Sequence, residues 1–248
     1  YKDIDDPSVW VSFPLQNASG ILADAALVAW TTTPWTLPSN MGACVHPNLE
    51  YAVISADNRH FVLLESKADS VFGEGTWEKL GTVQGAELTG LSYEPLFAFD
   101  GGEVVHEGTK RHVVSADTFV SDEDGTGIVH LAPYGADDFR IAQAEDITAL
   151  LAVGNEGRFL CDVADVKAGT FFRDANKPLA QDLKDRGRLI KRSQCNHSYP
   201  HCWRCDTPLL YFPSPAWFLK TTAYKDAMVE ENQRIRWAPS EIGEGRFG

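Results

Sequence analysis

The stretch ALVAWTTTPWTLPSN, residues 26–40, decides the fold class because a hydrophobic strand ends abruptly within it. Residues 26–31 are mostly apolar, as expected of a buried β-strand, and Pro34 and Pro38 stop strand pairing soon after. Short β-branched or aromatic runs separated by turn residues recur at residues 9–13, 51–54, 60–64, 111–114 and 127–130. This spacing is typical of a β-rich barrel or sandwich rather than of a parallel βαβ sheet.

Helical patterns are fewer and occur at residues 137–146, 174–186 and 223–235. The first begins with acidic residues, which the helix dipole favours, and the second ends at Gly187. We therefore predict an α+β, β-rich fold, a barrel-like domain with flanking helices. Composition changes at the aromatic and proline-rich residues 211–218, so we place the main domain at residues 1–194. Residues 195–248 are predicted to be a connector that is incomplete in this chain.

The charge balance restricts the partners that the protein binds. The 248 residues include 22 Lys and Arg against 35 Asp and Glu, a net charge of −13. Such a chain does not wrap a long nucleic-acid backbone by bulk electrostatics, and only a local contact is compatible with it. No apolar run approaches the roughly 18 residues that span a bilayer, and the first residues do not resemble a signal peptide. We expect a soluble, cytoplasmic protein with no membrane partner.

The residues TTTPWTLPSN, 31–40, place four threonines, a serine and an asparagine at the end of a strand. A strand that breaks into a loop presents hydroxyls and free backbone N–H groups together, which suits a site for a carbonyl or a ribose hydroxyl. The simpler interpretation is that threonine favours strands and the prolines make a turn. Both interpretations remain open on composition alone.

The residues GTGIVHLAPYGADDF, 125–139, run from a glycine turn through a short strand into a helix start. They place His130, Asp137 and Asp138 within nine residues. A histidine there can orient water or shape a pocket, and a carboxylate at a helix start can hold a substrate ammonium group. The alternative is a buried, hydrogen-bonded histidine beside aspartates that cap their own helix. The glycines do not form a phosphate-binding loop, because they precede a strand.

The five cysteines argue against a secreted disulfide framework, because their number is odd in a long chain. We expect Cys44 to pack in the core. Cys202 and Cys205 form a C-x-x-C pair, which supplies two of the four ligands of a structural zinc site. The site is completed by Cys195, His197 or His201, or by residues outside this chain; the alternative is a pair of free thiols. A zinc-knuckle-like connector is one expectation of the sequence.

These three stretches, in this order, resemble the editing insertion of the class I aminoacyl-tRNA synthetases for branched aliphatic amino acids, and specifically that of the isoleucyl enzymes. Residues 31–40 are similar to the family's threonine-rich motif and residues 125–138 to its second motif. Residues 197–204 resemble the segment that leads back toward the synthetic domain, and residues 237–248 the re-entry into it. His130 favours the isoleucyl enzymes, because valyl enzymes typically carry lysine there and leucyl enzymes methionine.

The resemblance implies hydrolysis of the ester that joins wrongly attached valine to the terminal adenosine of tRNA(Ile), which preserves the fidelity of translation. A hydrophobic pocket for isoleucine rejects valine by only about 1 to 3 kcal/mol, a limit of which isoleucyl enzymes are the usual example. The implied partners are the 3′ end of tRNA(Ile), the valyl ester and the rest of the synthetase. Editing would need no cofactor, a structural zinc at Cys202 and Cys205 is possible, and ATP would be used only by the full-length enzyme.

The resemblance also implies roles for individual residues. Asp138 would hold the α-ammonium group, while His130 and Trp35 would wall a pocket too small for isoleucine. Three hydroxyls would orient the attacking water and the ester carbonyl, those of Thr31, Thr32 and Thr33.

Three further residues are candidates for substrate binding. Asn40 would bind the terminal adenosine or hold its loop, and Gly127 and Asp137 would contact the substrate. The segment 133–135 is one residue shorter than is common in the family, so either Asp137 or Asp138 occupies the position of the essential carboxylate. No Ser-His-Asp or Cys-His arrangement is apparent, which favours direct attack by water.

Three alternatives accompany this hypothesis. An editing domain of a valyl enzyme would clear threonine from tRNA(Val). A non-catalytic tRNA-binding or zinc-knuckle module would use the C-x-x-C pair instead of the pocket. A free-standing deacylase would share the chemistry and act in trans. Four basic residues are candidates for local phosphate contacts, Lys110, Arg111, Arg140 and Arg158; the alternative is that these side chains are simply solvated.

Overall fold

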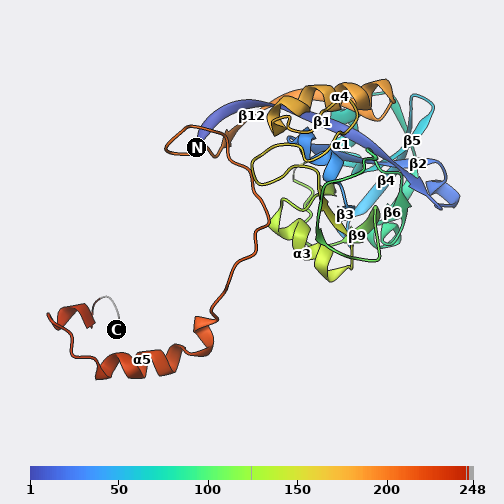
Figure 1. Ribbon diagram of the computed structural model, residues 1–248. Helices are drawn as coiled ribbons and strands as arrows, with labels where there is room; N and C mark the ends of the chain where they lie inside the picture. The colour runs from blue at the N-terminus through green and yellow to red at the C-terminus, as the bar shows by residue number, and fades with distance from the viewer. Residues whose placement is uncertain (124, 244, 246–248) are drawn as a thin grey trace. The chain divides into compact units, whose positions relative to one another are not determined.

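The computed structural model describes residues 1–123, 125–243 and 245, which form two compact units, residues 1–213 and 214–248 (Figure 1). The first unit is a mixed α/β body with one large sheet and few helices. The predicted division at residues 194/195 stays a prediction. A strand that is paired with β1 runs through that point as far as Tyr199. Of the expected re-entry segment, residues 244 and 246–248 lie outside the described residues.

The strands and helices have the following bounds. The strands are β1 Lys2–Gln16, β2 Ala25–Thr31, β3 Gly42–Val45, β4 Glu50–Ala56, β5 Arg59–Leu63, β6 Trp77–Gln84, β7 Ser92–Tyr93, β8 Glu103–His106, β9 Val113–Ala116, β10 Ile128–Leu131, β11 Ala149–Leu151 and β12 Leu189–Tyr199. The α-helices are α1 Glu65–Phe72, α2 Gly85–Leu88, α3 Ala136–Ala144, α4 Asn176–Asp185 and α5 Lys225–Arg234. The 3-10 turns are η1 Gly20–Leu22, η2 Pro34–Ser39, η3 Phe172–Ala175 and η4 Thr221–Ala223.

The six predicted strands and three predicted helices are all present, and only β1, which begins seven residues before the predicted start at Val9, departs from the expected bounds by more than a few residues. Each of them carries a local signal, either a β-branched run between turn residues or a helical pattern with a defined start or end. The helices α3 and α4 lie on opposite sides of the sheet-rich body, as Figure 1 shows. The longest missed element is β12, whose residues LIKRSQCNHSY are largely polar and are all half-buried or exposed.

The described sheet does not close into a barrel, so this part of the predicted fold is wrong. The large sheet has the order β10-β3-β9-β7-β1-β2-β5-β4-β6, with β12 paired to β1 beside this path. A closed barrel gives every strand two neighbours, whereas β10 and β6 end the order and do not pair with each other among the described residues. The edge strand β6 is largely exposed and carries Glu78 and Lys79, charges that discourage further pairing.

The core is built from alternating strand residues and from helices packed on the outer faces of the sheet. In the main cluster Val9, Val11 and Phe13 of β1 point inward, as the period of two in a strand requires. A second cluster buries Ala68 and Val71 of α1 against β4 and β5. A third joins β3 and β10 to α3 and contains Cys44, whose burial raises its pKa to about 12. The core role expected for Cys44 is confirmed.

The second unit, residues 214–248, contains η4 and α5 and exposes most of its side chains. Its large apolar residues are outward, including Trp217, Phe218 and Leu219. Across the part of the chain that the structure describes, no helix is both long and apolar enough to cross a membrane.

Candidate active site

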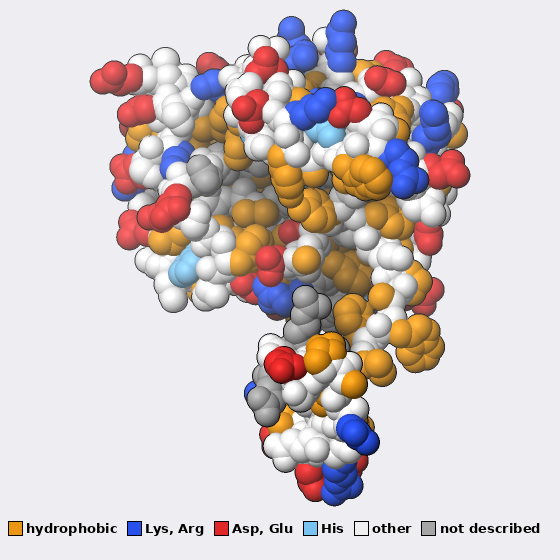
Figure 2. Space-filling model, turned by 90° about the vertical axis from the view of Figure 1, so that its left-hand side faces the viewer, with side chains coloured by type: hydrophobic (Ala, Val, Ile, Leu, Met, Phe, Trp, Pro, Cys, Tyr) orange, Lys and Arg blue, Asp and Glu red, His pale blue; other side chains and the backbone are white. Residues whose placement is uncertain are grey.

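A pocket of about 520 Å³ collects most of the predicted site residues in the first unit. It lies where β2 breaks into η2, where β10 leads into α3, and along the end of β12 and the loop that follows. Figure 2 shows a hollow with apolar side chains on this side of the molecule. The residues that line it are Tyr1, Trp30–Thr33, Trp35, Thr36, Val129, His130, Ala132, Tyr134, Gly135, Asp138, His197–Pro200 and Leu209–Tyr211.

The threonine-rich segment turns sharply after β2, because Pro34 begins η2. The Thr31 Oγ1 atom accepts the backbone N–H of Thr33 at 3.1 Å and lies 3.0 Å from Thr33 Oγ1. Thr33 Oγ1 in turn lies 3.3 Å from Thr36 Oγ1. The hydroxyls of Thr31, Thr33 and Thr36 therefore form one cluster on the wall of the pocket, and Thr32 lines it beside them.

His130 is buried at the base of this cluster, and its two ring nitrogens are both occupied. The Asn40 amide Nδ2 donates to Nδ1 of His130 at 3.0 Å, so the ring proton is assigned to Nε2. Nε2 donates to Thr36 Oγ1 at 2.8 Å, and the Thr36 hydroxyl donates to the Thr33 carbonyl at 2.8 Å. Burial lowers the pKa of His130 to about 4, so the ring is neutral at neutral pH.

Asn40 does not line the pocket but fixes the histidine from behind. Its Nδ2 also donates to the Gly42 carbonyl at 2.9 Å, and its Oδ1 accepts the hydroxyl of Tyr93 at 2.7 Å. Tyr93 is 1% exposed, so this hydroxyl has no competing water. The position of Asn40 fits the predicted alternative that it holds the loop. Sequence reasoning missed Tyr93, because the two-residue strand β7 carries no recognisable pattern.

Trp35 forms an apolar wall that neighbouring aromatic rings hold in place. Its ring centroid lies 4.8 Å from that of Tyr134 and 4.9 Å from that of Phe172, both in edge-to-face geometry. The backbone N–H of Trp35 donates to the side-chain oxygen of Asn176 at 3.0 Å. The Tyr134 hydroxyl contacts Ser39 Oγ at 3.1 Å, and burial raises its pKa to about 12. Sequence reasoning had not singled out Tyr134.

Asp138 is the carboxylate that faces the pocket. Its Oδ2 accepts the backbone N–H of Ala132 at 3.0 Å, and its pKa is raised to about 6, chiefly by burial. The carboxylate packs over Gly135, where an added Cβ would lie 2.9 Å from Asp138 Cγ. Glycine at the start of α3 therefore provides the space that Asp138 occupies.

Asp137 and Gly127 are not brought to the pocket wall. Asp137 is exposed and pairs with Arg140 at 3.3 Å, and Arg140 also pairs with Asp117 at 3.0 Å. Gly127 has φ +77°, and a Cβ there would lie 2.4 Å from Leu64. Its carbonyl accepts the Tyr51 hydroxyl at 2.7 Å. The geometry therefore favours Asp138 over Asp137, and it gives Gly127 a role in the backbone.

A third wall comes from a segment to which the sequence assigned no role in the pocket. His197, Ser198 and Tyr199 at the end of β12 line the pocket together with Leu210 and Tyr211. They are placed there by the pairing of β12 with β1 from Lys2↔Tyr199 to Val11↔Leu189. The resemblance of residues 197–204 to a family segment was the one available signal.

The zinc-knuckle expectation is not supported. No group of three or more His, Cys, Asp or Glu side chains that could hold a metal occurs in the ranges that the structure describes. The candidate ligands have other partners, because His197 Nε2 bonds Asp6 at 3.0 Å and His201 Nδ1 lies 3.0 Å from the Tyr199 carbonyl. Cys205 Sγ lies 3.3 Å from Thr207 Oγ1. A zinc bound by Cys202 and Cys205 with residues outside this chain stays a prediction.

Taken together, the pocket combines a neutral, fixed wall, a cluster of hydroxyls and one ionisable carboxylate. A carboxylate in a desolvated site binds an ammonium group strongly. The hydroxyls can donate to or accept from an ester and a water molecule. Because they bond to one another and His130 is already engaged on both nitrogens, the arrangement favours orientation of a water over an activated protein nucleophile.

Relatives of this chain are isoleucine–tRNA ligases. Those of Thermus thermophilus and Thermobifida fusca are 44% and 43% identical over 250 and 251 residues, and that of Thermoplasma volcanium is 43% identical over 249. Each alignment covers the whole of this chain but 23% of the relative, so the chain spans about a quarter of their length. No family model matches the chain.

Solved structures show the same fold at low identity. The CP1 domain of GlLeuRS has a TM-score of 0.59 at 15% identity, covering 75% of this chain and 99% of that one. The editing domain of the P. knowlesi cytosolic leucyl-tRNA synthetase has a TM-score of 0.54 at 10% identity, covering 78% and 98%. Similarity over the whole of this chain and this shared fold together show that the chain belongs to the isoleucine–tRNA ligase family, as a part with the fold of a CP1 editing domain.

Proposed function

We propose that this pocket hydrolyses the ester between wrongly attached valine and the 3′ end of tRNA(Ile). The observation that carries the proposal is the presence of Asp138 in one pocket with the fixed wall of His130 and Trp35 and the threonine hydroxyls. These are the groups that an aminoacyl ester requires: a partner for its ammonium, a surface for its side chain and hydrogen bonds for its carbonyl and the attacking water.

The ammonium group is bound by Asp138. One carboxylate oxygen is held by the Ala132 N–H, which orients the group within the pocket. With a pKa of about 6, the carboxylate is mostly ionised at neutral pH, and a bound ammonium stabilises the ionised form further. A desolvated carboxylate therefore recognises the one charge that the aminoacyl group carries.

The neutral wall of His130 and Trp35 selects the bound amino acid by the size of its side chain. Neither His130 nor Trp35 can move aside easily, since His130 is hydrogen-bonded on both nitrogens and Trp35 is packed between two aromatic rings. The additional methylene of isoleucine would overlap a wall at close packing. The same wall disfavours threonine as the substrate, because both ring nitrogens of His130 are already paired and offer no bond to a threonine hydroxyl.

Hydrolysis proceeds by attack of water on the ester carbonyl carbon. The water oxygen bonds to that carbon, the bond from carbon to the ribose oxygen breaks, and the ribose oxygen gains the proton that the water loses. Thr31, Thr32 and Thr33 orient the water and the carbonyl through their hydroxyls and backbone N–H groups. No metal or cofactor is required by these steps.

The remainder of a full-length synthetase is the proposed protein partner of this editing domain. We place the editing function in residues 1–194, with residues 195–248 as the connector to the remainder of a synthetase that holds the body of the tRNA. The exposed Trp217 and Phe218 support contact with that remainder. We also place this enzyme in the cytoplasm, where tRNA is aminoacylated.

The test compares release of amino acid from valyl-tRNA(Ile), isoleucyl-tRNA(Ile) and threonyl-tRNA(Val), each with a protein-free control. Selective release of valine is expected. Asp138→Ala should abolish it, while Asp137→Ala, a matched change at the neighbouring exposed carboxylate, should retain it. Full valine release by Asp138→Ala would refute the assignment, and preferential release of threonine would favour the valyl alternative.

A further inference from the structure

A second, open groove of about 700 Å³ adjoins the reaction pocket on the ribbon formed by β1 and β12. We call it the basic groove, and its polar walls include Arg173, Asn176, Lys177, Arg192, Ser193 and Gln194. Its cationic side chains come from η3, the first turn of α4 and the middle of β12, and none of them lines the reaction pocket.

Two contacts join the groove to the reaction pocket. Asp6, which lines the groove, bonds His197 Nε2 at 3.0 Å, and His197 lines the pocket. Asn176, which also lines the groove, accepts the backbone N–H of Trp35, a wall of the pocket. The two cavities are therefore neighbours separated by one layer of side chains.

The groove lies in the most basic part of an acidic chain. Residues 173–192 contain seven basic and three acidic residues, whereas the whole chain has a net charge of −13. In Figure 2, Lys and Arg side chains stand along the upper edge, the level at which α4 lies in Figure 1. A local positive surface beside a reaction pocket attracts a polyanion despite the overall charge.

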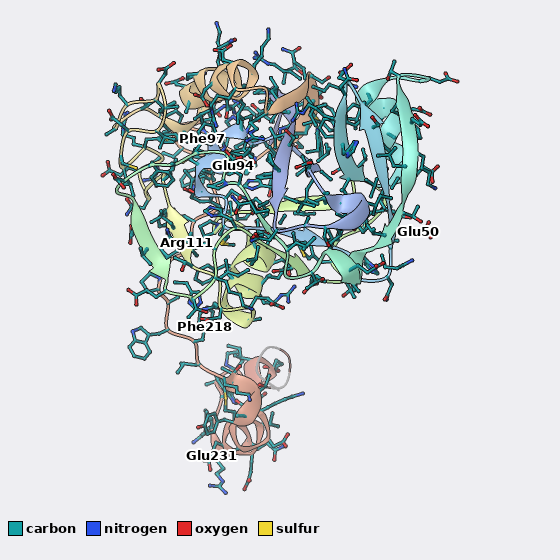
Figure 3. The ribbon with its side chains drawn as sticks, turned by 90° about the vertical axis from the view of Figure 1, so that its right-hand side faces the viewer. Glu50, Glu94, Phe97, Arg111, Phe218 and Glu231 are labelled. Carbon is teal, nitrogen blue, oxygen red and sulfur yellow. The ribbon has the colours of Figure 1, made fainter. Side chains whose placement is uncertain are left out.

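Several of these basic residues are already engaged by neighbours. Arg188 pairs with Glu94, and Arg186 lies 5.1 Å from the ring centroid of Phe97; Figure 3 labels both partners. By contrast, Lys177 and Arg192 are exposed and form no ion pair within the described ranges.

Both acidic residues of the groove have side-chain partners, and its three cationic side chains outnumber its two carboxylates. Asp6 is 5% exposed and forms an ion pair with Arg173. Asp5 accepts a hydrogen bond from the Asn196 side chain at 2.9 Å. The first turn of α4 carries no acidic residue and has Lys177 there instead, although a helix N-terminus favours acids.

We propose that the basic groove binds the phosphate backbone of the single-stranded tRNA end that delivers the ester to the reaction pocket, an inference that rests on the proposed function. Lys177 and Arg192 contact phosphate oxygens, and Ser193 and Gln194 offer neutral hydrogen bonds to the same backbone. The contacts depend on the charge of the backbone and not on the base sequence, because no described residue that lines the groove is aromatic and could stack on a base.

Binding of a fluorescent single-stranded RNA that ends in 3′ CCA tests the groove without requiring catalysis. Two to three phosphate contacts predict binding that weakens about sevenfold to eighteenfold between about 50 and about 200 mM salt. Lys177→Glu and Arg192→Glu should each weaken binding and lower the salt slope by about 0.7. Lys184→Glu is the matched control, since Lys184 is an exposed cation in the last turn of the same helix and does not line the groove.

The design separates lost contacts from lost folding. Glutamate in the first turn of α4 suits the helix dipole, whereas glutamate in its last turn does not, so the control variant is the more destabilised of the two. RNA binding that is absent in the parent chain, or equal in the parent, Lys177→Glu and Arg192→Glu, would overturn the proposal.

Hydrolysis of valyl-adenosine, which has no phosphate, is measured in parallel on the parent chain. Failure of that hydrolysis with RNA binding intact would count against the proposed function alone. Hydrolysis without Lys177- and Arg192-dependent RNA binding would count against the groove alone.

Discussion

His130 and Asp138 stand eight residues apart and line the same pocket, yet burial shifts their pKa values in opposite directions. Burial lowers the pKa of His130 to about 4 and raises that of Asp138 to about 6, in both cases by disfavouring the charged form. His130 has neutral partners on both nitrogens, so it is a fixed surface. Asp138 accepts the backbone N–H of Ala132 on Oδ2, and its carboxylate lines the pocket, where a ligand can reach it. Desolvation therefore keeps His130 neutral as a fixed surface of the pocket and leaves Asp138 as the group that binds a charged ligand.

The largest expected effect comes from removing the charge of Asp138. A hydrogen bond to a charged group contributes about 1.5 to 3 kcal/mol, so Asp138→Asn should lower kcat/KM for the valyl ester about 10- to 150-fold. The same variant should unfold at a higher temperature at pH 7.5, because the raised pKa means that the ionised carboxylate destabilises the fold by up to about 3 kcal/mol.

The sign of that stability effect follows from the raised pKa. The stabilising, protonated form of Asp138 is fully present below its usual pKa of 3.8 and is lost as pH rises through about 6. The stability difference between Asp138→Asn and the parent should therefore shrink toward pH 4 in calorimetry. Asp137→Asn is the control, and an equal stability gain there, or a loss of stability in Asp138→Asn, would contradict the comparison.

The pH profile of hydrolysis is the next test, because only one of the two residues titrates near neutral pH. The ionised form of Asp138 binds the ammonium, so kcat/KM should fall about tenfold between pH 7 and pH 5. His130 stays neutral over this range and adds no second step. A profile measured on the valyl ester in which kcat/KM rises below pH 6 would show that a protonated group carries the reaction.

Widening the wall should change selectivity more than rate. His130→Ala opens space for the methylene that distinguishes isoleucine from valine, which is worth about 1 kcal/mol or more, so release of isoleucine relative to valine should rise about fivefold. Competition between the two charged tRNAs measures this ratio directly. His60→Ala on β5, outside the pocket, is the control, and an unchanged ratio in His130→Ala would remove the residue from the size filter.

Local sequence signals predict the parts of this site that lie within one segment. The break at Pro34 places the threonines, and the glycine before α3 together with Asp138 places the carboxylate. What the sequence does not contain is the pairing between distant strands. The polar strand β12 has no alternating apolar pattern, so neither its pairing with β1 nor the third wall of the pocket is predictable from it. The open ends at β10 and β6 are a long-range property for the same reason.

The smallest expected effect tests how the wall is held. The Tyr93 hydroxyl donates to Asn40 Oδ1 at 2.7 Å, and this bond leaves the Asn40 Nδ2 to face His130 Nδ1. In Tyr93→Phe the amide is free to turn its oxygen toward Nδ1, which would move the histidine proton from Nε2 to Nδ1. Thr36 would then have to donate to Nε2 instead of to the Thr33 carbonyl, loosening the hydroxyl cluster.

We expect Tyr93→Phe to lower kcat for the valyl ester about threefold, the effect of one neutral hydrogen bond of about 0.6 kcal/mol. The decisive measurement is the pair of ¹⁵N chemical shifts of the His130 ring, which distinguish the two tautomers. Tyr51→Phe is a matched control, because Tyr51 is also fully buried but donates to the Gly127 carbonyl and does not contact Asn40. Unchanged ring shifts in Tyr93→Phe would mean that the Gly42 carbonyl alone orients the Asn40 amide, and that the Tyr93 hydroxyl does not fix the tautomer of His130.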